Sequence, residues 1–170
     1  MANPILITLG DPNGVGPRIA AKAWARPPLR RLGLAMVGSI DTFRRALGEE
    51  GVVGESVPWT PGTPLPTHGA AVWTPDGLPS CEVRPGEIDA DAGSQALACV
   101  ESAVRACLAG SARAMVTAPL AKESVALRTP GFSGHTGHIA ALCRAPSHCL
   151  ALVHGRLWAA FASIPSSPSS

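Results

Sequence analysis

The sequence predicts an α/β protein in which helices flank a mixed, mostly parallel β-sheet. Short apolar, β-rich runs alternate with segments whose apolar residues recur at helical spacing, and this β-α-β-α order is typical of parallel sheets. With 46% hydrophobic and 15% charged residues in 170, the chain can also bury a sizeable core. We expect one domain over residues 1–163 and a disordered Ser/Pro-rich tail over residues 164–170.

The N-terminal part predicts two successive strand–helix units. Residues 5–9 (ILITL) form an apolar run that ends at the glycine-rich loop 10–16 (GDPNGVG), and Pro17 then stands where a first helical residue is favoured. Residues 32–39 (LGLAMVGS) predict a second buried strand. The helix expected after it has apolar residues at helical spacing, namely Ile40, Phe43 and Leu47.

The middle of the chain predicts a long connection, a helix and a strand. Residues 53–85 are dense in proline and glycine, and only residues 70–73 (AAVW) resemble a strand. The next segment has apolar residues at helical spacing and ends at Gly110, which suits the C′ position after a helix. Those apolar residues are Leu97, Val100, Val104 and Leu108. Residues 112–119 (ARAMVTAP) predict the strand that follows.

Two apolar runs near the C-terminal end predict a β-hairpin. They are residues 148–153 (HCLALV) and 157–162 (LWAAFA), and they flank the tripeptide HGR, whose Gly155 suits a tight turn. This antiparallel pair is the reason why we expect the sheet to be mixed.

Composition and charge argue against several classes of function. The net charge is +2, and no Lys/Arg cluster with interleaved aromatic residues occurs, so nucleic acid is not an expected partner. No apolar run reaches the ~18 residues of a membrane span, and the N-terminus lacks signal-peptide features, so we expect no membrane association and a cytoplasmic location. Five cysteines without a C-x-x-C pair predict reduced thiols, most of them small core residues.

Two loops could carry chemistry. The loop 10–16 could offer backbone N–H groups and a helix N-terminus to an anion, but it matches neither the P-loop nor G-x-G-x-x-G, and a tight turn explains its glycines equally well. Thr117, Lys122 and Glu123 follow a predicted strand, at the edge where α/β sheets place ligands. They could hold a phosphate or polarise a carbonyl group, whereas the alternative is a turn-capping threonine and a surface lysine.

The stretch SGHTGHIAAL, residues 133–142, has two interpretations. His135 and His138 are three residues apart, so on a helix they share a face and could bind one metal ion. Alternatively, Thr136 is the N-cap of a helix that starts at Gly137, and His138 packs on its side. Two histidines without a third ligand favour the capped helix. The remaining histidines are expected to be polar surface groups, and they are His68, His148 and His154.

Four segments in order resemble the motifs of the 4-hydroxythreonine-4-phosphate dehydrogenase family. They are ITLGDPNGVGP, GEIDADAG, ARAMVTAPLAKE and GFSGHTGHIA, and the chain corresponds to the N-terminal half of that family. The resemblance implies an incomplete isocitrate/isopropylmalate dehydrogenase-like fold and a homodimer. It further implies NAD-dependent oxidative decarboxylation of a small phosphorylated substrate in pyridoxal phosphate biosynthesis, with zinc, magnesium or cobalt as the metal. Close paralogues act on phosphothreonate-like substrates.

The resemblance also implies roles for individual residues. His135 and Thr136 correspond to substrate contacts, and Lys122 corresponds to a lysine that lines the same cleft and is a candidate catalytic residue. Cofactor contacts cannot be assigned. The family holds its metal with three histidines, the first of them just after the hairpin, where residues 161–170 (FASIPSSPSS) contain none. We therefore expect no metal ligand within this sequence.

Two residues depart from the family pattern. Arg18 stands where the family usually has a glutamate, and Gly137 stands where it usually has an acidic residue. These departures and the missing metal ligands support an alternative function, in which a fragment or divergent paralogue binds ligand or partner subunits without turnover.

Overall fold

A five-stranded, wholly parallel sheet forms the core of the first of two compact units, Met1–Phe132 and Ser133–Ser170. The computed structural model describes residues 3–161, so the predicted tail at residues 164–170 and the domain boundary at residue 163 lie outside the described residues. The predicted α/β class, with a mostly parallel sheet flanked by helices, is confirmed.

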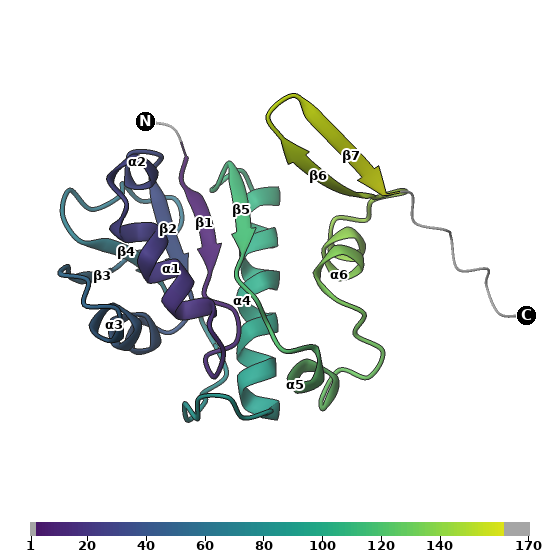
Figure 1. The fold of residues 1–170 in the computed structure, drawn as a ribbon, viewed down its shortest axis with the longest axis horizontal. Helices are drawn as coiled ribbons and strands as arrows, with labels where there is room; N and C mark the ends of the chain where they lie inside the picture. The colour runs from purple at the N-terminus through teal and green to yellow at the C-terminus, as the bar shows by residue number, and fades with distance from the viewer. Residues whose placement is uncertain (1–2, 162–170) are drawn as a thin grey trace, which may run out of the picture. The chain divides into compact units, whose positions relative to one another are not determined.

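The strands of the parallel sheet lie in the order β3-β4-β2-β1-β5 (Figure 1). Their bounds are Ile5–Thr8 for β1, Leu34–Val37 for β2, Ser56–Pro58 for β3, Ala70–Trp73 for β4 and Ala114–Thr117 for β5. Thr8 is in register with Val37 on one side and with Thr117 on the other. Because these strands end at the same level, the loops that follow them meet at one edge of the sheet.

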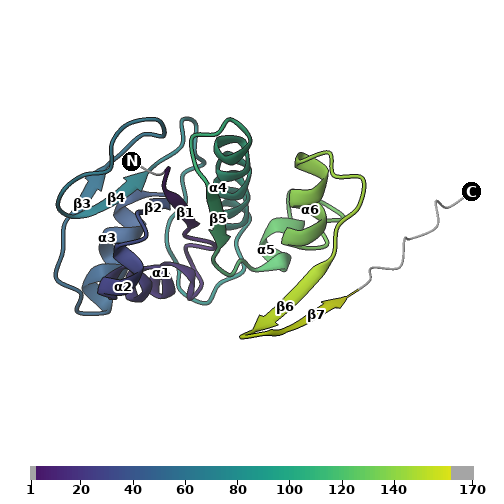
Figure 2. The same cartoon turned by 90° about the horizontal axis from the view of Figure 1, so that it is seen from above.

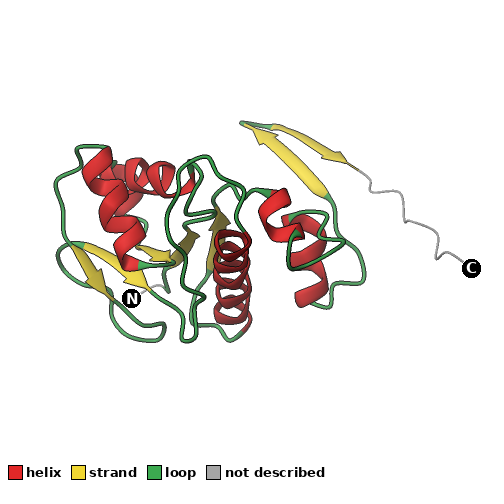
Figure 3. Ribbon diagram, turned by 90° about the horizontal axis from the view of Figure 1, so that it is seen from below, coloured by secondary structure: helices red, strands yellow, loops and turns green. Residues whose placement is uncertain are grey.

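Helices cover both faces of this sheet (Figures 2 and 3). Their bounds are Gly16–Ala25 for α1, Pro27–Arg30 for α2, Ile40–Glu49 for α3, Ala90–Leu108 for α4 and Lys122–Ala126 for α5. Met36 of β2 packs with α1 and α3 in one apolar cluster, while its neighbours Ala35 and Val37 pack with α4 in the other. This alternation follows from the two-residue repeat of a strand.

The sequence predicts the longer elements of this unit and misses three short ones. The strands β1, β2, β4 and β5 and the helices α1, α3 and α4 occur where expected. β3 was missed because it has three residues and ends in proline, and its pairing with β4 at the sheet edge is what defines it. The helices α2 and α5 were missed because each is too short to show a repeat. Of the four apolar residues at helical spacing in α4, Leu108 is 63% exposed, because it lies in the last turn of the helix.

The second unit holds the helix α6, His135–Leu142, and the predicted hairpin, β6 at Leu150–His154 and β7 at Leu157–Phe161. Gly155 lies in the turn with φ of 58°, as a tight hairpin turn requires. The expectation that this pair belongs to the main sheet is wrong, since β6 and β7 form a separate two-stranded sheet. Antiparallel pairing needs only a short turn, so it is complete within the second unit.

The predicted start of α6 is also wrong. The helix begins at His135, so Thr136 is its second residue and not its N-cap. The N-cap is Gly134, which has φ of 128° and makes no side-chain capping bond. A residue with a Cβ rarely adopts this conformation, so the glycine allows the chain to turn into the helix two residues earlier than a threonine cap at position 136 would.

All five cysteines are free thiols, and only Cys99 is buried. Burial raises the pKa of the Cys99 thiol to about 12. The expectation that most cysteines are core residues is wrong, because Cys143 and Cys149 are exposed in the second unit. None of the helices within residues 3–161 has the length and hydropathy needed to cross a membrane.

Candidate functional site

The carboxyl edge of β1 and β5 is the candidate site of the first unit. From β1 the chain continues through α1 to β2 on one side, whereas α4 leads to β5 on the other side of β1 (Figure 1). Open α/β sheets bind ligands at such a reversal of strand order, outside the carboxyl ends of the strands. The glycine-rich loop after β1 and the loop that leads to Lys122 after β5 both start here.

Backbone atoms of these two loops are in direct contact. The Asp11 N–H donates to the Pro119 carbonyl oxygen over 3.1 Å. Gly10 has φ of 71°, and a Cβ added there would collide with the same Pro119 oxygen. A Cβ on Gly16 would collide with the Leu9 carbonyl oxygen. The structure therefore favours the tight-turn interpretation of these glycines, which face the protein's own backbone.

Asn13 joins the glycine-rich loop to the segment before α4. Its side chain is buried, with the residue 4% exposed, and its Oδ1 accepts the Arg84 N–H over 2.7 Å. Its Nδ2 donates to the Glu87 carbonyl oxygen over 3.2 Å, and its own carbonyl oxygen accepts the Gly86 N–H over 2.8 Å. Sequence patterns do not single out Asn13, because no local pattern indicates partners more than 70 positions away.

Asp11 shapes the same loop from within. Its Oδ1 accepts the Asn13 N–H over 2.8 Å, and its carbonyl oxygen accepts the Gly14 N–H over 3.0 Å. This arrangement is an Asx-type turn.

The thiol of Cys81 is close to the acidic groups of Asp89 and Asp11. Its burial is the largest of the causes that raise its pKa to about 11, and the negative charges of these two residues are the next. Cys81 is therefore protonated near neutral pH and is a poor nucleophile.

The start of α4 fixes the position of α5, whose first residue is Lys122. Asp89 caps α4 by accepting the Ala92 N–H over 2.8 Å, and its own N–H donates to the buried Ser124 Oγ over 3.3 Å. A Cβ on Gly93 would collide with the Ser124 carbonyl group. Lys122 is exposed on the helix that this close contact holds. Three of the four sequence motifs are thus packed together in the first unit.

The fourth motif lies in the second unit. His135 is half-buried and Thr136 is exposed, and both stand in the first turn of α6. Gly137 follows within the same helix, and the His138 N–H donates to the Gly134 carbonyl oxygen over 3.4 Å. The structure thus brings His135 and Thr136 together, and it places Lys122 in the other unit. Within residues 3–161, no group of three or more His, Cys, Asp and Glu side chains could hold a metal ion.

Arg18, the charge reversal in α1, has a partner in this chain. It forms an ion pair with Glu50, the C-cap residue of α3, and the Lys22 Nζ lies 2.9 Å from the Glu50 Oε2. The Glu50 side chain is only 8% exposed. Hydrogen bonds from Lys22 and Arg18 hold the pKa of Glu50 below its ordinary value. Arg18 therefore helps to join α1 to α3 in this protein.

The Glu50 cluster predicts a pH-dependent contribution to stability. Because the folded state lowers the pKa, the contribution is complete above the carboxyl's unfolded pKa and is lost as the pH falls through the folded-state pKa. We expect Glu50→Gln to lower the free energy of unfolding near neutral pH and to have little effect in acid. Urea unfolding at both pH values measures this, with the exposed Glu55→Gln as the control. An equal loss at both pH values would contradict the prediction.

Removing the Asn13 side chain is expected to loosen the segment before α4. Asn13→Ala leaves the Arg84 N–H and the Glu87 carbonyl oxygen without their partner, and we expect a loss of roughly 2–3 kcal/mol. Hydrogen exchange of the Arg84 amide should become faster. The exposed Asn3→Ala, which also removes a bond to a carbonyl oxygen, is the control and should cost less than about 1 kcal/mol. An unchanged Arg84 exchange rate would be inconsistent with this role.

Known proteins match this chain in sequence and in fold. The model of the family described as "Pyridoxal phosphate biosynthetic protein PdxA" matches residues 40–166. The 4-hydroxythreonine-4-phosphate dehydrogenase of Maricaulis maris is 37% identical over 152 residues, which are 83% of this chain and 43% of that protein. The D-threonate 4-phosphate dehydrogenase of Pectobacterium atrosepticum is 30% identical over 165 residues, 92% of this chain and 49% of that protein.

A solved structure has a similar fold. The crystal structure of 4-hydroxythreonine-4-phosphate dehydrogenase from Klebsiella pneumoniae matches with a TM-score of 0.83 at 31% identity, covering 94% of this chain and 49% of that chain. The fold and the packed motifs define an α/β protein with a candidate ligand site at a switch point of its sheet. The chain belongs to the pyridoxal phosphate biosynthetic protein PdxA family, and its relatives are dehydrogenases. It spans about half the length of the curated relatives it matches.

Proposed function

We propose that this chain takes part in the NAD-dependent oxidative decarboxylation of 4-hydroxythreonine-4-phosphate, a step toward pyridoxal phosphate. The observation that carries the proposal is the family match over residues 40–166, which includes the G-H-T sequence at residues 134–136. Relatives that bear the name of this activity support it. We also propose, from the family resemblance, that the protein acts as a homodimer on this small phosphorylated substrate.

The proposed substrate contacts are His135, Thr136 and Lys122. The first turn of α6 carries an imidazole and a hydroxyl group on consecutive residues, and both can hydrogen-bond to polar groups of a hydroxy acid. Holding the substrate's carbinol carbon in one orientation lowers the entropic part of the reaction barrier. The exposed ammonium group of Lys122 is suited to pair with a phosphate or carboxylate group of the substrate.

The proposed reaction uses NAD as hydride acceptor together with a divalent metal ion, namely zinc, magnesium or cobalt. The described residues do not fit the metal ion, and the glycine-rich loop does not fit a dinucleotide. Residues 3–161 contain no cluster of three or more potential metal ligands, and Gly10 and Gly16 face protein backbone where a dinucleotide would need an open cradle. We therefore assign no metal or cofactor contact to the described residues and derive no step through them.

A second substrate is D-threonate 4-phosphate. The observation that favours it is the Pectobacterium atrosepticum relative, which bears that name and covers 92% of this chain. The two substrates share a phosphate group and hydroxyl groups, so His135, Thr136 and Lys122 suit both. They differ at the amino group, which is replaced by a hydroxyl group in the threonate.

The test measures NADH formation by the full 170-residue chain with each substrate, in the presence of zinc, magnesium or cobalt. We expect turnover with 4-hydroxythreonine-4-phosphate to exceed turnover with D-threonate 4-phosphate, and the reverse order would favour the second substrate. Substrate binding is measured in parallel by calorimetry. Binding without NADH formation would overturn the proposed activity and support the alternative of a ligand-binding protein without turnover. If folded protein shows neither binding nor turnover, the proposed activity and the ligand-binding alternative are both overturned.

Three variants test the proposed contacts. His135→Ala, Thr136→Val and Lys122→Ala should each lower kcat/KM, with a loss of about 100-fold for His135→Ala because the substrate loses its orientation. His68→Ala, outside the four motifs and in the first unit, is the matched histidine control and should retain the activity of the unchanged protein. Equal activity of His135→Ala and His68→Ala would remove His135 from the proposed site.

A further inference from the structure

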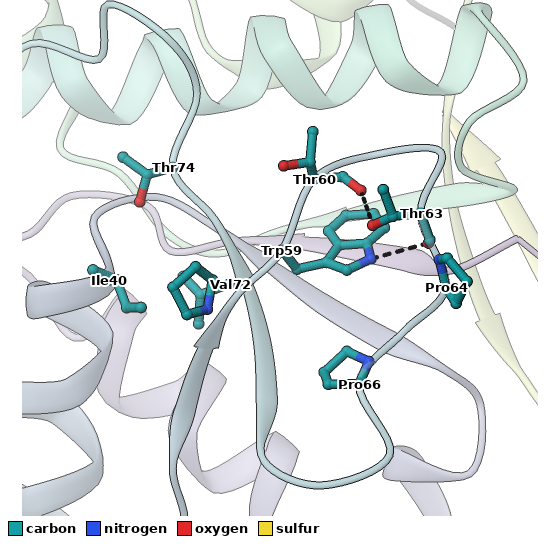
Figure 4. Close-up of a pocket in the computed structure, with 9 residues that line it drawn as sticks. Ile40, Trp59, Thr60, Thr63, Pro64, Pro66, Val72 and Thr74 are labelled. Carbon is teal, nitrogen blue, oxygen red and sulfur yellow. Dashed lines mark hydrogen bonds between the residues drawn. The ribbon is translucent and has the colours of Figure 1, made fainter.

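A hollow lies at the carboxyl ends of β3 and β4, apart from the packed motifs. It has a volume of about 390 Å³, within the usual range for small-molecule sites. Its apolar lining includes Pro58 at the end of β3, Val72 in β4 and Ile40 at the start of α3. Figure 4 shows Trp59 in the middle of this region, with Pro64 and Pro66 on the loop beyond it. The hollow belongs entirely to the first unit.

The polar side-chain groups of this hollow are the hydroxyl groups of three threonines and the indole N–H of Trp59, and none of its nine described lining residues is charged. The Thr63 hydroxyl donates to the Thr60 carbonyl oxygen over 2.7 Å, and the Thr74 hydroxyl donates to the Gly38 carbonyl oxygen over 3.0 Å. Because the hydroxyl protons of Thr63 and Thr74 are already used, these two oxygens retain only acceptor capacity. They suit a ligand that carries an N–H or O–H donor.

The start of α3 adds hydrogen-bond donors, whereas the threonine oxygens are acceptors. Ile40 is the first residue of this helix. The Ser39 Oγ accepts the Thr42 N–H, so the Ile40 and Asp41 N–H groups are the ones left without a partner within the helix. These groups favour an acceptor such as a carbonyl oxygen. With no side-chain cation among the lining residues, a phosphate or carboxylate group would lose hydration without gaining a charged partner. The hollow therefore differs in chemistry from a site for a phosphorylated substrate.

The loop that closes the hollow is held in place by its own hydrogen bonds. The Trp59 Nε1–H donates to the Thr63 carbonyl oxygen over 3.1 Å, and the Trp59 backbone N–H donates to Val72 of β4 over 2.8 Å (Figure 4). The Thr63 N–H also bonds to the Thr60 carbonyl oxygen. A loop fixed in this way, with prolines at 64 and 66, loses little entropy when a ligand binds.

We propose that this hollow, lined by Ile40, Trp59, Thr60, Thr63, Val72 and Thr74 among others, is a second binding site, and that it takes a small uncharged ring compound bearing a carboxamide group. The ring packs on the apolar lining, the amide N–H donates to threonine oxygens, and the amide carbonyl oxygen accepts from the start of α3. This site does not depend on the proposed dehydrogenase function.

The test compares benzamide with benzoate, which have the same shape and differ in charge. Both are titrated into the full chain, and the Trp59 indole N–H and the Thr74 amide are followed by NMR. We expect benzamide to shift both signals with a dissociation constant of order 1 mM, and benzoate to bind at least about tenfold more weakly. No shift with benzamide, or equal affinity for the two compounds, would overturn the proposal.

Two variants place the bound ring. Ile40→Trp fills the hollow from the start of α3 and should lower benzamide affinity at least about tenfold. Thr60→Val removes a hydroxyl group from an exposed residue, so it leaves the fold intact, and should lower the affinity by roughly threefold. Thr129→Val, outside the hollow, is the control and should bind as the unchanged protein does. Unchanged affinity in both Ile40→Trp and Thr60→Val would overturn the proposed position.

Discussion

Gly10→Ala is expected to destabilise the protein by about 3–5 kcal/mol. Two physical effects add: an L-residue at φ of 71° costs roughly 1–2 kcal/mol, and the new Cβ would collide with the Pro119 carbonyl oxygen, which forces the loops after β1 and β5 apart. Urea unfolding monitored by circular dichroism measures the loss. The same substitution should also disturb the Asp11 N–H bond to Pro119, which amide exchange reports.

Gly77→Ala separates the two effects of Gly10→Ala. Gly77 has φ of 70°, almost the same as Gly10, but a Cβ there would meet no atom within 4 Å. We expect this control to lose only about 1–2 kcal/mol, the cost of the backbone conformation alone. If the two variants lost equal stability, the close approach of the glycine-rich loop to Pro119 would have no energetic importance.

Gly93→Ala is expected to lose roughly 2–3 kcal/mol and to displace α5. The added Cβ would collide with the Ser124 carbonyl group and with the Val125 N–H group, both of them backbone atoms that cannot rotate away. Because α5 starts at Lys122, we also expect the Val125 amide, which donates to the Ala121 carbonyl oxygen, to exchange faster. Urea unfolding and hydrogen exchange measure the two effects.

Gly48→Ala is the matched helix control. Gly48 lies in α3, and a Cβ there would meet no atom within 4 Å. Alanine is a better helix former than glycine by about 0.5–1 kcal/mol, so this variant should be slightly more stable than the unchanged protein. The two substitutions thus have the same chemistry and opposite expected signs. A gain in stability for Gly93→Ala would contradict the tight contact between α4 and α5.

Local patterns account for the parts of the fold that the sequence predicted. The strand β1 is a short apolar, β-rich run, the helix α4 has apolar residues at helical spacing, and Gly110 ends α4 at the predicted C′ position with φ of 74°. The hairpin turn at Gly155 follows the same logic. In contrast, β3 has no pattern of its own and exists through pairing with β4. Thr136 is a suitable N-cap residue by its type, but the backbone conformation of Gly134 makes that glycine the N-cap, so α6 starts at His135.

The candidate site was predicted only in part. The order of four motifs indicated the family, and family membership is confirmed. The same motifs could not reveal that Asn13 bonds to Arg84 and Glu87, because those bonds join residues 71 and 74 positions apart. The roles of His135, Thr136 and Lys122 stay predictions that the variants above test.

The sequence by itself determined the local elements, the order of the motifs and the family of this protein. Each of these can be recognised from patterns among residues that are close together in the chain. Only the tertiary structure decided which backbone atoms the glycines approach and which sheet contains the hairpin strands. Gly10 meets Pro119 and Gly93 meets Ser124 across gaps that local spacing does not encode. β6 and β7 pair with each other and leave the main sheet wholly parallel, since short antiparallel pairing closes locally while parallel pairing requires a distant strand.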